Sequence, residues 1–332
     1  MQNRQQRRAA RGSEPVVVAL RPQHRQAVAM VPLIGVHSTA DLGQGVPFGN
    51  CMVTNNRAVL HSLVDPYLEA MIGALESDAV RSAEMVVYRR IDDRNRTPPS
   101  GEDNLVELLG YLTTARRLVD SLWYIRDSAA RFDLGFLNVR GITSSKSFHA
   151  GDYCRADGTR DTVAITAEEI MRADTIRPHV EGRIAVTGAQ AEAPRFTRAD
   201  YFLQAARSAS DVGVKVAFYC TCLEALLAPR DTTELTYRLA ERAAIIASER
   251  PGERRETFSL VREAYAARSR VIHGDVLSDR RVRELPQVAV KLDDVLRRLL
   301  NRLLADAALM ATFHEDRADD YFADAIFGGA TS

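Results

Sequence analysis

Beyond residue 194 the chain is a succession of helical sequence patterns joined by short connections. These patterns predict helices over residues 198–228, 234–248, 253–272 and 286–313, and a shorter one over residues 319–327. Thr232 or Thr233 provides a cap for the second helix, and Gly274 ends the third, since helices favour these residue types at their ends. Four helices with short connections favour a bundle, in which each helix buries an apolar face against its neighbours.

The sequence that precedes the bundle is of mixed character. Strands are expected over residues 27–33 and 85–91, and a hairpin is expected over residues 149–165. Helices are expected over residues 55–75, 104–127 and 167–174. Pro66 lies inside the first of these helices and can kink or split it. The expected fold class is therefore α+β, with a mixed α/β N-terminal part and a mainly α-helical C-terminal part.

These patterns divide the chain into three parts. Residues 1–14 are expected to be a disordered basic tail, residues 15–187 the mixed α/β part, and residues 188–332 the helical domain. The helix over residues 104–127 could also contact the bundle, which leaves the boundary between the two larger parts open. The tail carries arginines and no large apolar residue after Met1, so it can contact RNA or an acidic surface, or simply remain solvated.

Composition excludes several classes of protein. Apolar residues make up 46% of the chain, which is too many for a mainly disordered protein. The 44 basic and 44 acidic residues cancel, which argues against a globally basic nucleic-acid binder and leaves room for a local basic surface. No apolar run is long enough to span a bilayer, and no apolar segment follows the N-terminal charges as it would in a secretory signal.

The four cysteines are too few and too scattered for a disulfide framework, so we expect a cytoplasmic protein. Cys220 and Cys222 lie two positions apart in an expected helix and point to different sides, which favours buried free thiols over a zinc site. Trp123 and Tyr124 adjoin an apolar stripe, which favours a place in the core over a base-stacking platform. Neither a phosphate-binding loop nor a nucleophile elbow is present, so nucleotide hydrolysis and esterase chemistry have no support.

The most informative stretch is residues 265–274, which read Tyr-Ala-Ala-Arg-Ser-Arg-Val-Ile-His-Gly. Arg268 lies in line with apolar residues, including Tyr265 and Ile272, and a guanidinium there is costly unless it is paired or faces a polar cleft. His273 is the last residue before the expected helix stop, where the helix dipole favours a protonated imidazole. Arg268 and His273 are about 140° apart around the helix, so the length of arginine, a relaxed helix end or a second copy of the segment would have to bring them together.

An arginine and a histidine suit one chemistry well. RNA carries its own nucleophile, the 2′-hydroxyl, beside each phosphate. A histidine can transfer a proton in that reaction, and an arginine can stabilise the charge that develops on the phosphate oxygens. Short Arg-x4-His strings also occur by chance, however, and by itself this one is also consistent with a structural role.

The region from about residue 218 to residue 275 resembles the HEPN superfamily, specifically the Apea-like HEPN domains. Three blocks carry the resemblance in the same order on three successive expected helices: Phe218-Tyr219 with residues 223–227, residues 233–240 with Arg242-Ala243, and residues 265–274. The resemblance implies a HEPN-type helical bundle. It also implies a metal-independent endoribonuclease without a cofactor, whose active site lies in a cleft between two copies of the domain.

Carried onto this sequence, the resemblance implies that Arg268 and His273 are catalytic, with Ser269, Arg270 and Glu234 as supporting residues. It further implies RNA as the substrate, a homodimer or higher homo-oligomer, and a role in antiviral defence or toxin-like growth arrest. Residues 15–187 would then sense a trigger or bind a partner. For Glu224, Glu234 and Arg242 in the matching blocks, ion pairing between helices is favoured over catalysis.

Two alternatives remain open. Many members of the superfamily have Asn, Asp or His after the arginine, whereas this chain has Ser269, as Apea-like domains commonly do. A bundle that binds RNA or oligomerises without cutting RNA is therefore one alternative. The other is a purely structural bundle in which Arg268 belongs to a buried salt bridge.

Overall fold

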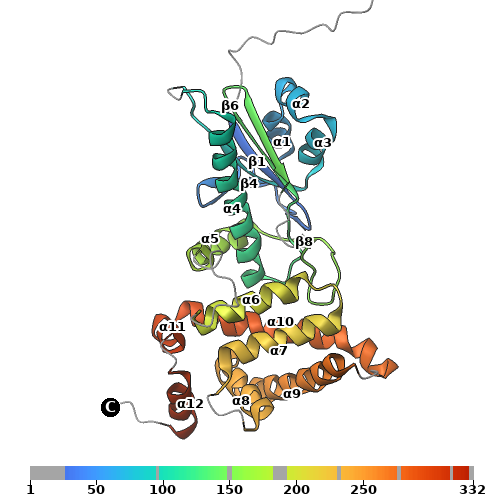
Figure 1. Ribbon diagram of the computed structural model, residues 1–332, viewed down its shortest axis with the longest axis vertical. Coiled ribbons are helices and arrows are strands. Elements are labelled where there is room, and N and C mark those ends of the chain that lie inside the picture. Colours follow the sequence, from blue (N-terminus) through green and yellow to red (C-terminus); the bar gives the residue numbers. More distant parts are fainter. Residues whose placement is uncertain are drawn as a thin grey trace, which may run out of the picture.

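The computed structural model describes residues 27–94, 97–147, 152–181, 193–229, 233–274, 278–314 and 317–328. It confirms the α+β class: a six-stranded antiparallel sheet lies in the N-terminal part, and the C-terminal part is helical (Figure 1). The basic tail at residues 1–14 and most of the connector at residues 188–194 lie outside the described residues. Within the described ranges, no helix combines the length and the hydropathy needed to cross a bilayer.

The central sheet has the strand order β3-β4-β5-β1-β6-β7, and every neighbouring pair is antiparallel. Its strands are β1 (Val28–Leu33), β3 (Val46–Phe48), β4 (Cys51–Thr54), β5 (Met85–Arg90), β6 (Leu134–Val139) and β7 (Ile142–Ser147). A separate parallel pair joins β2 (Val36–His37) to β8 (Val163–Ala164). The expected strands over residues 27–33 and 85–91 are therefore confirmed as β1 and β5.

Helices cover both faces of this sheet (Figure 1). On one face lie α1 (Arg57–Leu63), α2 (Pro66–Ile72) and α3 (Ala74–Ser82); on the other lie α4 (Gly101–Ile125) and α5 (Ala167–Glu181). Successive residues of a strand point to opposite faces, so Met30 of β1 packs toward α1–α3 and Val31 packs toward α4. This two-sided burial explains why β1 is a continuous apolar run.

The expected helix over residues 55–75 is split in two. Asp65 lies at the break and accepts a hydrogen bond from the Leu68 amide at 2.7 Å, while Pro66 takes the first position of α2. Proline is favoured there because its missing N–H would have no partner inside the helix. The expected helix over residues 104–127 starts earlier, at Gly101, because Ser100 and Asp103 form a reciprocal capping box.

The expected hairpin over residues 149–165 was wrong for the part that is described. From residue 152 to residue 165 the chain makes a tight turn, with the Arg155 amide donating to the Thr159 carbonyl at 2.8 Å, and contributes only β8 to a strand pair. The hairpin lies earlier, between β6 and β7. Its two turn residues, Arg140 and Gly141, both have positive φ, and sequence rules expect Asn or Asp rather than Arg before the glycine.

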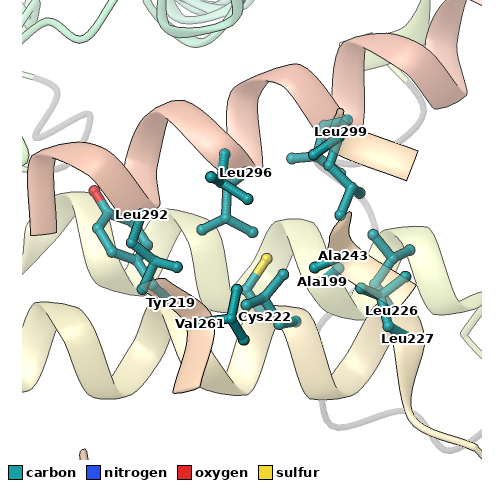
Figure 2. Close-up of a cluster of buried hydrophobic side chains, with 14 of the residues drawn as sticks. Ala199, Tyr219, Cys222, Leu226, Leu227, Ala243, Val261, Leu292, Leu296 and Leu299 are labelled. Atoms are coloured by element: carbon teal, nitrogen blue, oxygen red, sulfur yellow. The ribbon is translucent and has the colours of Figure 1, made fainter. Parts of the chain in front are cut away.

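The C-terminal helices pack around one apolar core, part of which Figure 2 shows between facing helices. They are α6 (Arg195–Ser208), α7 (Val212–Leu227), α8 (Leu235–Ala247), α9 (Pro251–His273), α10 (Asp279–Ala305), α11 (Ala307–His314) and α12 (Ala318–Phe327). The expected helix over residues 198–228 was wrong: it is an αα-hairpin, α6 and α7, broken where Asp211 caps α7 by accepting from the Val214 amide. The expected helix over residues 286–313 is also divided in two. Helix α10 begins before Pro286 and ends at Ala305, and α11 follows it.

Helix α4 belongs to both cores. Its middle turns, with Leu112 and Leu118, pack under the sheet, whereas Trp123 and Tyr124 in its last turn are buried in the core of the helical bundle. The expectation that these two aromatic residues are core residues is therefore confirmed. Polar groups reinforce the junction: the buried Arg207 of α6 donates to Asp120 of α4 at 3.2 Å, and the Tyr153 hydroxyl donates to the same carboxylate at 3.1 Å.

Asp293 of α10 is the centre of this junction. Its buried carboxylate accepts hydrogen bonds from the Trp123 indole at 2.9 Å and from the Tyr219 hydroxyl at 2.8 Å, and it pairs with Arg297. Arg297 in turn donates to the backbone carbonyl of Trp123 at 2.8 Å. One carboxylate therefore holds α4, α7 and α10 together.

We expect Asp293→Ala to lower the free energy of unfolding by about 3–5 kcal/mol, because it leaves the buried Trp123 and Tyr219 donors without their acceptor and removes the main partner of the largely buried Arg297. The neighbouring Asp294 is 55% exposed and also faces Arg297, so Asp294→Ala is the matched control, with an expected loss below about 1 kcal/mol. Denaturant unfolding followed by the fluorescence of Trp123, the single tryptophan of the chain, measures both. Equal losses in the two variants would contradict this role of Asp293.

Candidate functional site

Helix α9 carries the segment that the sequence analysis singled out. Pro251 begins the helix, and Gly274 ends it with a φ of 74° while its amide donates to the Val271 carbonyl at 3.3 Å. This left-handed conformation is the one that glycine adopts most easily at the end of a helix, so the predicted stop is confirmed. His273 is consequently the last residue of α9, at the negative end of the helix dipole.

Arg268 makes an ion pair across two helices. Its guanidinium lies 3.2 Å from one carboxylate oxygen of Glu224 on α7 and 3.4 Å from the other. The two side chains are 32% and 22% exposed, so the pair is partly buried. The expectation that a guanidinium on this apolar stripe needs a partner or a polar cleft is met by Glu224.

The packing of α7 against α9 explains how these side chains meet. The Tyr265 hydroxyl donates to the Cys220 carbonyl at 3.1 Å, and Val271 lies against Gly213 near the start of α7, so the two helices are antiparallel. Side chains lean toward the N-terminus of their own helix. Arg268 and Glu224 therefore lean toward each other, although their helix positions are offset.

His273 is exposed at the end of α9. Among the described residues, none forms a hydrogen bond or an ion pair with its imidazole. Arg268 faces α7, whereas His273 projects from the last turn, so the structure does not bring them into contact within one copy of the described chain. This agrees with their expected angular separation around the helix.

The supporting residues are placed differently from one another. Ser269 is exposed and Arg270 is half-buried, both beside Arg268 on α9. Glu234 is exposed just before α8, and Tyr237 in the first turn of α8 contacts the ring of Phe258 at a centroid distance of 5.1 Å. Phe258 precedes Arg268 by ten residues, about 15 Å along the helix, so the structure does not group Glu234 with Arg268.

Ion pairing accounts for two of the three charged residues in the matching blocks. Glu224 pairs with Arg268, and Arg242 pairs with Asp319 of α12 at 2.6 Å while donating to the Leu227 carbonyl at 3.0 Å. Both residues therefore form the expected ion pairs between helices. Glu234 has no ion pair within the described part of the chain.

A small apolar surface next to His273 was missed from the sequence. Ile272 lies on the apolar stripe noted in the sequence, but it is 62% exposed, whereas Tyr265 on the same stripe is 6% exposed. The physical reason is that α9 reaches the end of its partner here, because Val271 already contacts Gly213 at the start of α7. Val214, next to Gly213 in the first turn of α7, is 40% exposed, so each helix presents one apolar side chain to solvent next to the residue that makes this contact.

All four cysteines are free and buried, and for Cys220 and Cys222 this confirms the expectation of buried free thiols. Burial raises the pKa of the Cys220 and Cys222 thiols, so both are protonated at neutral pH and are poor nucleophiles. Burial also raises the pKa of Tyr265, which keeps its hydroxyl protonated as a donor to the Cys220 carbonyl. Across the described ranges, no three His, Cys, Asp or Glu side chains are grouped as they would be around a metal ion.

Comparison with known proteins adds no relative. No family model, no curated protein and no solved structure matches this chain. The resemblance to HEPN domains therefore rests on the residues of the three matching blocks. Arg268 and His273 are candidates because of their chemistry and their positions on α9.

We expect Arg268 and Glu224 to be coupled by about 1 kcal/mol in a double-mutant cycle, because the pair is only partly buried. The cycle consists of Arg268→Ala, Glu224→Ala and the double variant, each measured by denaturant unfolding. Arg280 and Glu284 form an exposed pair, with side chains 81% and 46% exposed, and provide a control cycle with an expected coupling below about 0.5 kcal/mol. Equal coupling in the two cycles would show that the first pair contributes nothing beyond a surface contact.

Proposed function

We propose that this protein is a metal-independent endoribonuclease of the Apea-like HEPN kind. One observation carries the proposal: an exposed histidine ends a helix whose preceding turns present a partly exposed arginine. Among the described residues, none forms a hydrogen bond or an ion pair with the imidazole of this histidine, so its nitrogens are accessible to a bound substrate. The resemblance of the three sequence blocks supports the same assignment.

The proposed reaction uses the 2′-hydroxyl of RNA. This hydroxyl attacks the adjacent phosphorus, the bond from phosphorus to the 5′-oxygen of the next nucleotide breaks, and the products are a 2′,3′-cyclic phosphate and a 5′-hydroxyl. His273 acts as the general acid/base that transfers the proton. Arg268 has five N–H donors, more than its two contacts with Glu224 use, so its guanidinium can also neutralise charge on the phosphate.

A second copy of the chain completes the site in this proposal. Arg268 and His273 do not meet within one copy, and the exposed apolar side chain of Ile272, next to His273 in the chain, suits burial against another protein surface. We therefore propose a homodimer in which the C-terminal ends of two α9 helices border a common cleft. The proposal places this activity in the cytoplasm, in antiviral defence or toxin-like growth arrest, with a trigger bound by the N-terminal part.

A second candidate function is a non-catalytic module that binds RNA or oligomerises. The observation that favours it is the Arg268–Glu224 pair, since the carboxylate already neutralises the guanidinium that would have to stabilise the transition state. Ser269, which is exposed, is compatible with both functions. Cleavage and binding must therefore be measured on the same preparations.

We expect the purified protein to cleave single-stranded RNA in excess EDTA, and we expect His273→Ala to reduce the rate by about 10²–10⁴-fold through loss of proton transfer. His314 is also exposed and also ends a helix, α11, so His314→Ala is the matched control and should keep the wild-type rate. Gel analysis of the product ends checks for the cyclic phosphate.

The other outcomes of the cleavage assay separate the candidates. RNA binding without cleavage by the wild type would favour the non-catalytic module. Equal cleavage by wild type and His273→Ala would assign the activity to another site or to a contaminating nuclease, and would remove His273 from the mechanism.

We expect Ile272→Asp to weaken self-association by about tenfold or more and to reduce cleavage, because it places a charge in the proposed interface. Leu75 is 84% exposed on α3, far along the chain from α9, so Leu75→Asp is the control for the addition of one surface charge. Analytical ultracentrifugation measures the dimer. A dimer that is equally stable in both variants would place the interface elsewhere.

A further inference from the structure

A second candidate site lies in the N-terminal part, away from α9. A cavity of about 670 Å³ is bordered by α4, by α5 and by the turn between β3 and β4, which contains Gly49 and Asn50. Cavities of this size hold small-molecule ligands in many proteins. Figure 1 shows α5 beside α4, below the sheet, and residues of both helices line the cavity.

One face of α4 forms the long wall of the cavity. Glu107, Gly110, Thr114 and Arg117 follow at spacings of three, four and three residues and all line it. This spacing places the four residues on successive turns of one helix face, over about 15 Å. The wall thus begins with a carboxylate, passes a glycine and ends with a guanidinium.

Gly110 is not explained by packing within the protein. It lies in the interior of a 25-residue helix, where glycine costs about 1 kcal/mol relative to alanine. A Cβ atom at this position would meet no other heavy atom within 4 Å, so no neighbouring side chain requires the glycine. What the glycine does is leave the backbone of α4 bare at the middle of the cavity wall.

The positive end of the cavity is built from two elements. Arg117 of α4 and Arg177 of α5 both line it. The Asp174 carboxylate forms an ion pair with Arg177, whose Nε lies 2.8 Å from a carboxylate oxygen. The same carboxylate accepts a hydrogen bond from the Gly49 amide at 2.8 Å. The arginine, the turn and α5 are therefore fixed to one another before any ligand binds.

The other end of the cavity has a hydrogen-bond acceptor, the carboxylate of Glu107. The Glu107 carboxylate accepts a hydrogen bond from the Tyr111 hydroxyl at 3.2 Å. Burial and the nearby Glu107 raise the pKa of Tyr111 to about 12, so the phenol remains a donor at neutral pH. A carboxylate has room for several donors, and Glu107 is only partly buried, so it can also accept from a ligand.

We propose that this cavity binds a small phosphorylated molecule that carries hydroxyl groups, a sugar phosphate or a nucleotide. Arg117 and Arg177 bind the phosphate, because guanidinium groups match its geometry with paired hydrogen bonds. Glu107 accepts hydrogen bonds from the hydroxyl groups, and the bare backbone at Gly110 leaves space for the ring between the two ends. This site does not depend on the proposed ribonuclease activity.

The test uses the full-length protein with ribose 5-phosphate and AMP as probes, in isothermal titration calorimetry at low salt. We expect saturable binding of at least one probe below about 1 mM, weakened about tenfold or more in Gly110→Leu, because the added side chain fills the cavity. Leucine is a good helix former and meets open space here, so this variant should melt no lower than the wild type. Ribose and adenosine, which lack the phosphate, should bind at least about tenfold more weakly.

Gly101 provides the matched control. It is also an exposed glycine of α4 with no heavy atom within 4 Å of a Cβ, but it does not line the cavity, so Gly101→Leu should bind like the wild type. Arg117→Gln should weaken the phosphorylated probes and leave their uncharged counterparts unchanged. AMP binding alone assigns the site to nucleotides, and binding of both probes assigns it to sugar phosphates in general.

Three results would overturn the proposal. Absence of binding of both probes up to about 1 mM would reject the ligand class. Undiminished binding in a folded Gly110→Leu variant would place the ligand elsewhere. Equal binding of AMP and adenosine would show that the arginines do not recognise a phosphate.

Discussion

The buried carboxylate of Asp293 and the indole of Trp123 join the two halves of the molecule. A buried carboxylate is costly to desolvate, and Asp293 offsets this cost through an arginine, a phenol and the indole. Because Trp123 belongs to α4, whose middle turns pack under the sheet, the position of the sheet relative to the bundle depends on this contact. The nearby pair of Arg207 and Asp120 adds a second buried connection between the same parts.

The same helices connect the regions to which functions are proposed. Helix α4 carries the wall of the cavity proposed to bind a phosphorylated molecule, and it carries Trp123 in its last turn. Helix α7 contributes Tyr219 to the Asp293 junction and, five residues farther along, Glu224 to Arg268. Helices α4 and α7, with these hydrogen bonds and the ion pair, therefore connect the N-terminal part to the segment that ends at His273.

The ion pair of Arg268 gives this segment two opposing properties. Pairing with Glu224 holds the guanidinium in place, which in the proposed ribonuclease would favour precise positioning of a phosphate. In that proposal the same carboxylate reduces the positive charge available to the RNA. The exposed imidazole of His273 and the exposed Ile272 follow Arg268 on α9, where α9 extends past the start of α7. A second protein surface that covered Ile272 would also shield His273 from water and strengthen the electrostatic interactions there.

The sequence alone was sufficient for the features that depend on local chemistry. The period of the apolar residues predicted α4 and α9, the glycine at position 274 predicted where α9 ends, and the placement of Arg268 on an apolar stripe predicted that it needs a partner or a polar cleft. Local rules were insufficient where two conformations have similar energies. The residues between α6 and α7 suit a continuous helix as well as a break, and Arg140 is an unusual residue for a hairpin turn. Tertiary structure alone decided that Glu224 is the partner, that Ile272 is exposed and that one face of α4 lines a cavity. These features arise from contacts between residues far apart in the chain, and the free energy of such contacts is set by which surfaces meet rather than by the neighbours of each residue in the sequence.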